Sequence, residues 1–183
     1  SVDYSTVNYK DGLCLNGLGR LVKTYPHVPG VDFAGSVITS SDDRYKPGDK
    51  VIMHGWRGGE IRWGGYATKA NEKADWLTPL PEGLSSFEAM CLGTAGFTAM
   101  LAIKRLEDNG MAPESGEILV TSAGGRVGSV ATILLSTKGY KVAAMTGRPE
   151  IADYLMWLGA SRNVTREEML NDPGKVLESS IWG

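Results

Sequence analysis

The pattern of hydrophobic and polar positions divides the chain into two differently organised parts. In the first part, short apolar runs of strand length are separated by turns that contain proline and glycine, such as Pro29-Gly30 and Pro47-Gly48. Runs bounded in this way predict a β-rich and turn-rich module. The predicted strands cover residues 31–39, 50–54, 65–70 and 76–80.

A helical pattern follows these strands. Ser85 and Glu88 have the spacing of a capping box, which predicts the start of a short helix. Gly93 is expected to interrupt this helix, and a longer amphipathic helix is expected over residues 94–109, with Gly110 ending it. The longer helix is predicted to bridge two modules, so the domain boundary falls near Gly93.

Residues 117–148 alternate between strand and helix patterns. Ile118 to Val120 form a short apolar run, and the glycine-rich segment TSAGGRVGS follows it directly. Apolar and small residues then recur at helical spacing over residues 127–137, and a second buried strand is expected over residues 141–145. A βαβ unit of this length is typical of nucleotide-binding crossovers.

The loop of this unit has the composition of an anion-binding turn. Glycine lets the backbone approach a phosphate closely, and free N–H groups at a helix start favour an anion. Gly125 and Gly128 occupy the last two glycine positions of a G-x-x-G-x-x-G pattern, whereas Ser122 stands at the first. An ordinary turn between a strand and a helix explains the same glycines. The strand before the loop and the helix after it therefore carry the interpretation of the loop as a nucleotide-binding turn. The loop residues expected to contact a dinucleotide are Gly124, Gly125, Arg126 and Val127.

The end of the second strand indicates which dinucleotide is bound. An NAD enzyme places an acidic residue there for the ribose 2′-OH, whereas a 2′-phosphate needs cationic or neutral donors. The residues here are Thr146, Gly147 and Arg148, without an acid. These three residues are therefore expected to bind NADP(H). The alternative is a solvated arginine before a helix that begins at Pro149.

Composition narrows the function classes. Of the 183 residues 42% are hydrophobic and 22% charged, which is ordinary for a soluble globular protein. A net charge of −2 and the lack of a basic run argue against nucleic acid, and no apolar stretch near 18 residues is apparent, so no membrane is expected. Cys14 and Cys91 fit reduced thiols in a cytoplasm. The expected partner is a small molecule, and the terminal SSIWG predicts the start of another strand in a chain that is a fragment.

The chain contains several short motifs: NYKD at 8–11, PGVDFAG at 29–35, PGDKV at 47–51, WGGYA at 63–67, GTAGFTAM at 93–100 and TGR at 146–148. Together they resemble one family, the medium-chain dehydrogenase/reductases, in their zinc-independent quinone-oxidoreductase-like branch, and within it the bacterial acrylyl-CoA reductases. The resemblance implies an α/β protein with a GroES-like β-rich catalytic domain, residues 1–93, and a Rossmann domain with a doubly wound parallel sheet, residues 94–183, both truncated. It also implies a homodimer at full length. Arg126 departs from the family, which usually has glycine there, and must avoid positive φ or accept strain.

The zinc enzymes of this family raise the question of a metal. Where they show His-Glu, this sequence has Val31 and Asp32, and two cysteines cannot form a four-sulfur site. The two histidines, His27 and His54, stand alone in turn and strand contexts, where hydrogen-bonded structural roles are common. We therefore expect no metal.

Without a metal, the chemistry must come from the cofactor and a few donors. Reduction of an enoyl thioester builds charge on the thioester oxygen and needs a proton for the α-carbon. The family's NYKD tyrosine lies beside the nicotinamide, so Tyr9 is the expected proton donor and a cofactor contact. A tyrosine packed between modules is the alternative. Thr94 is a further candidate unless it only caps its helix, and Trp56 and Trp63 either line a pocket or anchor a loop.

The resemblance thus predicts NADPH-dependent reduction of the C=C bond of a short enoyl-CoA, most simply acrylyl-CoA to propionyl-CoA. Two alternatives remain open. The same site would pass hydride to a quinone or enone, and a non-catalytic NADP-binding fragment fits the same loop.

Overall fold

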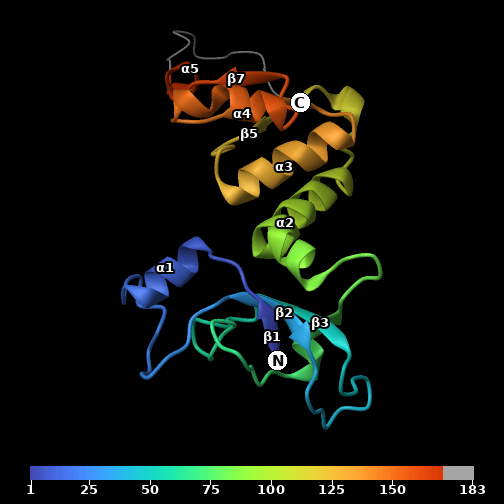
Figure 1. Ribbon diagram of the computed structural model, residues 1–183. Coiled ribbons are helices and arrows are strands. Elements are labelled where there is room, and N and C mark those ends of the chain that lie inside the picture. The colour runs from blue at the N-terminus through green and yellow to red at the C-terminus, as the bar shows by residue number, and fades with distance from the viewer. Residues whose placement is uncertain (171–183) are drawn as a thin grey trace. The chain divides into compact units, whose positions relative to one another are not determined.

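The computed structural model describes residues 1–170, which fall into two compact units (Figure 1). The first unit comprises Ser1–Phe97, and the second begins at Thr98. The strand expected at SSIWG lies outside the described residues. Each unit is described by itself below.

The first unit is built on a four-stranded antiparallel sheet with the order β1-β2-β3-β4. Phe33 pairs with Met53 and Ala34 with Ile52, and all four side chains are buried. The strands expected at residues 31–39, 50–54 and 76–80 are present in similar or shorter form. The strands are β1 (Val2–Tyr4), β2 (Asp32–Ser36), β3 (Lys50–His54) and β4 (Leu77–Pro79), with a 3₁₀ turn, η1 (Ala74–Trp76), before β4.

The prediction of a strand over residues 65–70 is wrong, because this segment forms no strand in the structure. This segment instead lies against the backbone of the loop before β2, where Gly65 N donates to Gly30 O at 2.9 Å and Gly64 N donates to Val28 O at 2.7 Å. A Cβ atom on Gly64 would overlap Gly30 O, and one on Gly65 would lie 2.5 Å from Asp32 O. The paired glycines therefore serve a close backbone approach, which a regular strand with side chains does not allow.

The long helix α2 (Ser86–Glu107) is interrupted where the sequence predicted. Gly93 has φ 53° and ψ −157°, outside the helical region. A Cβ there would lie 2.7 Å from Thr6 Cγ2, so only glycine fits both the conformation and the space. The predicted capping box is confirmed, since Ser85 N donates to Glu88 Oε2 at 2.9 Å and Glu88 N donates to Ser85 Oγ at 3.2 Å.

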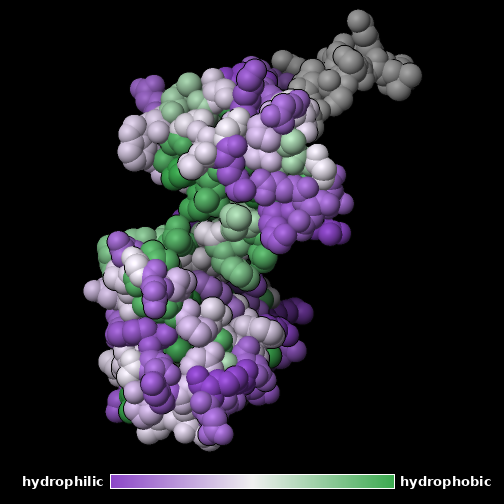
Figure 2. Space-filling model, turned by 90° about the vertical axis from the view of Figure 1, so that its right-hand side faces the viewer, coloured by the Kyte–Doolittle hydropathy of each residue, from purple (hydrophilic) through white to green (hydrophobic). Residues whose placement is uncertain are grey.

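Within the described residues, α2 is also the one helix long and apolar enough to cross a membrane by length and composition. The expectation that no apolar stretch approaches 18 residues is therefore wrong for this helix. Its kink and its buried side chains, among them Met90, Ala99 and Ile103, are features of a core helix. Figure 2 shows hydrophobic surface gathered at the level of α2, where Phe97 and Leu101 are about half exposed.

The second unit contains a three-stranded parallel sheet with the order β5-β6-β7. Its core is a cluster of buried apolar side chains that includes Val142, Ala144 and Leu155. The predicted βαβ unit is confirmed, and β6 has the predicted bounds. The elements are η2 (Pro113–Ser115), β5 (Glu117–Val120), α3 (Arg126–Thr137), β6 (Lys141–Met145), η3 (Pro149–Ile151), α4 (Ala152–Trp157), β7 (Arg162–Val164) and α5 (Arg166–Leu170).

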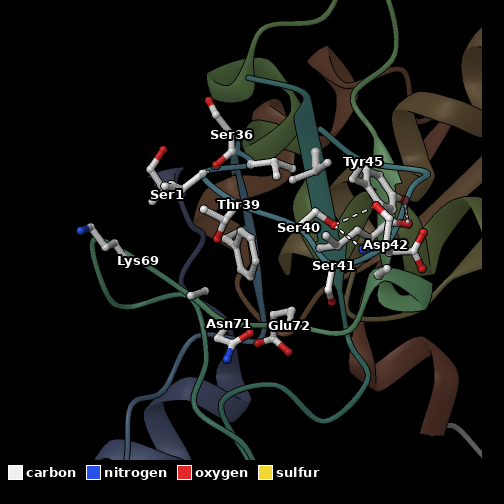
Figure 3. Close-up of a pocket in the computed structure, with 17 residues that line it drawn as sticks. Ser1, Ser36, Thr39, Ser40, Ser41, Asp42, Tyr45, Lys69, Asn71 and Glu72 are labelled. Carbon is white, nitrogen blue, oxygen red and sulfur yellow. Dashed lines mark hydrogen bonds between the residues drawn. The ribbon is translucent and has the colours of Figure 1, made fainter. Parts of the chain in front are cut away.

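A pocket of about 460 Å³ lies on the first unit, and none of the residues predicted to act in a site lines it (Figure 3). Phe33 and Val51 form part of its wall, and Ser40 and Asp42 bond to each other at its rim. Glu72 also lines it, and Glu72 Oε1 is buried without a hydrogen-bond partner in the described residues. Burial raises the pKa of this carboxyl above its ordinary value, and Arg62 opposes the shift.

Replacing Glu72 with Gln is expected to raise the thermal unfolding temperature at pH 7 and to change it little at pH 4. A raised folded-state pKa means that the stability present below the ordinary value of 4.5 is lost as the pH rises through the folded value. Unfolding temperatures of wild type and Glu72→Gln between pH 4 and pH 7 measure this, with the exposed Glu82→Gln as a control for charge. The same difference at every pH would contradict the account.

Candidate functional site

The loop between β5 and α3 turns sharply at Ser122. This residue has φ 51°, which lies in the left-handed region that glycine adopts without strain. Gly125 N donates to Ser122 O at 2.8 Å. Ser122 thus takes the conformation of the first glycine that the sequence pattern lacks. A Cβ on Gly128 would lie 2.5 Å from Ser122 O, so glycine is required where the loop meets the helix.

The start of α3 follows the glycine-rich loop directly. Gly125 is the N-cap, no side chain caps the helix, and its first turn holds no acidic residue. Such a helix start favours an anion, because an acid that would compete for the first N–H groups is absent. Arg126 is the first helical residue and does not have positive φ, so it avoids the strain that a non-glycine risked there. Val127 follows on the same turn and is 42% exposed.

The residues after β6 lie against this loop. Arg148 N donates to Thr146 Oγ1 at 3.1 Å, and Arg148 Nη2 donates to Gly124 O at 2.9 Å. A Cβ on Gly124 would overlap Ile151 Cδ1 and lie 2.8 Å from Arg148 Nη2. The structure therefore brings the predicted loop and the predicted strand end together, and the missing side chain of Gly124 permits it.

These segments border a pocket of about 300 Å³. Its lining contains two arginines and no acidic residue, which makes it suitable for an anion. Arg126 and Val127, predicted as contacts, are not part of that lining, and Arg166 is a lining residue that the sequence analysis missed. A signal for it existed, because Arg166 follows a parallel strand at the sheet edge where ligands bind. The lining residues are Ser122, Gly124, Gly125, Thr146, Gly147, Arg148 and Arg166.

Tyr9, the predicted proton donor, is the first residue of α1 (Tyr9–Leu15) in the first unit. The sequence analysis did not predict this helix. Tyr9 is 84% exposed. The helix start is held by a buried carboxylate, since Asp11 Oδ2 accepts from Asn8 N at 2.8 Å. Asp11 Oδ1 also accepts from Gly30 N and Val31 N, at 3.1 and 3.0 Å.

A second buried carboxylate, Asp32, fixes the segment before α1. Its oxygens accept from Thr6 N at 3.1 Å, from Thr6 Oγ1 at 2.7 Å, from Thr94 N at 2.8 Å and from Thr94 Oγ1 at 2.6 Å. Asn8 Nδ2 in turn donates to Thr6 Oγ1 at 2.7 Å. The hydroxyl of Thr94 is thus bonded to Asp32, and sequence reasoning considered Asp32 only in connection with a metal.

The two histidines have separate surroundings. Nε2 of His27 lies 2.8 Å from Gly59 O. His54 stacks on Phe97 with ring centroids 5.5 Å apart, and burial lowers the pKa of His54 while the charge of Asp32 opposes the shift. In the part of the chain that the structure describes, no three His, Cys, Asp or Glu side chains are grouped to hold a metal ion. That no metal is needed stays a prediction.

The two tryptophans considered as pocket residues contact other loop residues instead. Trp56 stacks on Trp76 with centroids 5.8 Å apart, and Trp63 Nε1 donates to Pro26 O at 3.2 Å. Neither lines the pocket beside β6 or the larger pocket of the first unit. Their contacts favour the loop-anchoring alternative.

Known proteins resemble this chain over its whole length. Residues 1–82 match the alcohol dehydrogenase GroES-like domain. The acrylyl-CoA reductase AcuI of Ruegeria pomeroyi is 63% identical over 182 residues, which cover 100% of this chain and 55% of that relative. The putative quinone oxidoreductase YhfP of Bacillus subtilis is 48% identical over 181 residues, again 55% of the relative. The chain thus spans about half the length of the relatives it matches.

Solved structures agree with these relatives. The yhdH oxidoreductase of Salmonella enterica, crystallised in complex with NADP, superimposes with a TM-score of 0.94 at 48% identity, covering 99% of this chain and 55% of that one. The yhfP protein of Bacillus subtilis, crystallised with NAD bound, gives a TM-score of 0.93 over the same shares at 47% identity. The chain therefore belongs to the medium-chain dehydrogenase/reductases, in their quinone-oxidoreductase-like branch, with a GroES-like domain followed by part of a Rossmann domain.

Proposed function

We propose that the protein to which this chain belongs uses NADPH to reduce the C=C bond of a short enoyl-CoA, acrylyl-CoA to propionyl-CoA. The acid-free pocket with two arginines beside the glycine-rich loop carries the cofactor assignment. The substrate assignment rests on the 63% identity to an acrylyl-CoA reductase. Residues 1–93 are assigned the catalytic role and residues 94–183 the cofactor, in a cytoplasmic homodimer.

The residues of the second unit fit a phosphorylated dinucleotide. The loop is a cradle that side chains would fill, since Cβ atoms on Gly124 and Gly128 would meet other atoms closely. We assign the pyrophosphate to Gly124, Gly125, Arg126 and Val127 at the helix start. We assign the 2′-phosphate to the strand end, Thr146 to Arg148, which offers a hydroxyl and a guanidinium. The cofactor supplies a hydride to the β-carbon when bound.

Tyr9 is assigned the proton for the α-carbon and a contact with the cofactor. A phenol O–H donates a hydrogen bond and can act as a general acid. Its exposed side chain leaves the hydroxyl accessible to substrate. Asp11 and Asp32 act as positioning residues, because they fix the backbone on either side of Asn8. An exposed donor on a well-held helix start suits a site that must orient a substrate.

A second candidate is a quinone or enone reductase, favoured by the 48% identity to a putative quinone oxidoreductase. A conjugated carbonyl accepts hydride at its β-carbon as an enoyl thioester does, so both candidates need the same residues. A non-catalytic NADP-binding protein is the third candidate, and it needs only the residues of the second unit.

For the full-length protein, we expect kcat/KM for acrylyl-CoA to exceed that for a simple quinone. The comparison uses NADPH as the donor in both assays and follows its absorbance. A marked preference for the quinone would select the second candidate. Tight NADPH binding without turnover of either substrate would select the non-catalytic one.

Replacing Tyr9 with Phe is expected to lower kcat by about 10² to 10⁴, the usual contribution of general acid catalysis, and to leave NADPH affinity nearly unchanged. Tyr4→Phe is the matched control, because Tyr4 is also partly exposed in the first unit and contacts Phe87. Steady-state kinetics and NADPH titration give the two numbers. A loss of kcat below tenfold would indicate that Tyr9 is only a positioning contact and that water supplies the proton.

Replacing Asp32 with Asn is expected to lower both the free energy of unfolding and kcat. The amide turns one acceptor oxygen into a donor that faces Thr6 or Thr94, and hydrogen bonds to a charged group contribute about 1.5 to 3 kcal/mol each. Denaturant unfolding and kcat at saturating substrate measure the two effects, with the exposed Asp43→Asn as control. A folded variant with unchanged kcat would refute the positioning role of Asp32.

A further inference from the structure

An exposed aromatic and cationic patch lies on the first unit, outside the two pockets described above. Trp56 stacks on Trp76 with an angle of 12° between the ring planes. Arg62 Cζ lies 4.8 Å from the centroid of the Trp76 ring, and Lys73 Nζ lies 5.2 Å from it. The stack leaves Trp56 56% exposed, and Arg62 and Lys73 are exposed as well. We call these four residues the tryptophan platform.

The cations of the tryptophan platform are not neutralised by the acidic side chains of the same loops. Glu60 accepts from a lysine of α1, and Asp75 pairs with an arginine of another loop. The charge of Arg62 acts on Glu72, but Glu72 lines the larger pocket. No ion pair joins Arg62 or Lys73 to a carboxylate in the part of the chain that the structure describes. The platform therefore offers its positive charge to an anionic ligand.

A buried carboxylate connects the loop of the tryptophan platform to the helix that carries the predicted proton donor. Glu60 is 6% exposed, its Oε1 accepts from Lys10 Nζ at 2.8 Å, and its Oε2 lies 3.6 Å from Arg57 Nε. Lys10 follows Tyr9 in α1, and Arg57 follows Trp56 in the loop. Glu60 thus ties the start of α1 to the segment that presents the exposed tryptophan.

A ligand that suits this surface combines a flat ring with negative charge. Every nucleobase has a π-face that stacks on an exposed tryptophan, and arginine and lysine bind phosphate oxygens. In a CoA thioester the adenine and the 3′-phosphate supply both features, at the end of the molecule that is remote from the acyl group. A quinone has no phosphate, so it offers the platform no anionic group.

We propose that the tryptophan platform binds the 3′-phosphoadenosine end of the CoA thioester, with the adenine on Trp56 and the phosphate against Arg62 and Lys73. This inference rests on the proposed function, because it needs a CoA thioester as the substrate. It adds a recognition site that shares no residue with the arginine pocket of the second unit, which Arg148 and Arg166 line. The platform acts on substrate binding and leaves the chemical step to other residues.

The test compares two substrates of the full-length protein, acrylyl-CoA and S-acrylyl-pantetheine, which has the same thioester without the phosphoadenosine. Trp56→Ala is expected to raise KM for acrylyl-CoA about five- to a hundredfold, the usual range for loss of a base-stacking ring. KM for S-acrylyl-pantetheine, and kcat for both substrates, should stay within about twofold. Trp56→Phe should retain part of the affinity, and Arg62→Gln should raise KM for acrylyl-CoA alone.

A second measurement needs no turnover. Calorimetry of the NADP⁺-saturated protein with 3′,5′-ADP, at one low salt concentration because salt screens exposed charges, should show weaker binding in Trp56→Ala and Arg62→Gln. NADPH affinity should be the same in every variant, which distinguishes the phosphoadenosine of CoA from that of the cofactor. Trp157→Ala, which removes an exposed and stacked tryptophan of the second unit, is the matched control, and Arg105→Gln controls for net charge.

The outcomes separate the inference from the proposed function. An equal rise of KM for both substrates in Trp56→Ala would make Trp56 a structural residue, and an unchanged KM for both would make the platform a loop anchor only. Either result overturns the inference and leaves the proposed function standing. A wild type that does not reduce acrylyl-CoA would overturn the proposed function, and the inference with it.

Discussion

The candidate cofactor site depends on the hydrogen bond from Arg148 to the carbonyl of Gly124. It joins two segments that arise on neighbouring strands, and it is possible because Gly124 has no side chain to overlap Ile151. A guanidinium has several N–H groups in a fixed fork, so one can hold the loop while others stay available. Both partners of this contact line the pocket, so the loop and the strand end border it together.

In the first unit, two buried carboxylates hold the backbone around the start of α1. Asp11 and Asp32 are 2% and 0% exposed, and every bond described for them comes from an N–H or hydroxyl donor, with no cation among these partners. A buried charge is tolerated only when its oxygens are satisfied in this way. The result is a rigid setting for the start of α1, on which the exposed Tyr9 stands. Rigidity of the backbone and exposure of one phenol are what a substrate-orienting donor requires.

Local signals explain which parts of the fold could be predicted. The βαβ unit, the capping box at Ser85 and the break at Gly93 follow from periodicity and from residues a few positions apart. The strand expected over residues 65–70 failed because its paired glycines serve contacts with a distant loop. The helix α1 was missed for the related reason that Asp11, which holds its start, also bonds to the distant residues Gly30 and Val31.

The same distinction applies to the candidate site. Residues of the glycine-rich loop and of the β6 end were identified because each lies in a recognisable pattern, and five of them line the pocket: Gly124, Gly125, Thr146, Gly147 and Arg148. Arg166 was not predicted as a pocket residue, because its position depends on the pairing of β6 with β7, and no short sequence motif indicates that pairing. The role of Asp32 in holding the backbone was not predicted, because its four hydrogen-bond donors come from segments far apart in the chain.

The central claim is that the arginine pocket of the second unit holds the 2′-phosphate of NADPH. A crystal structure of the full-length protein with NADP⁺ tests it most directly. The account predicts phosphate oxygens about 2.7 to 2.9 Å from guanidinium nitrogens of Arg166 or Arg148, as charge-assisted bonds require. A 2′-phosphate that points to solvent, with both guanidinium groups turned away from it, would contradict the account.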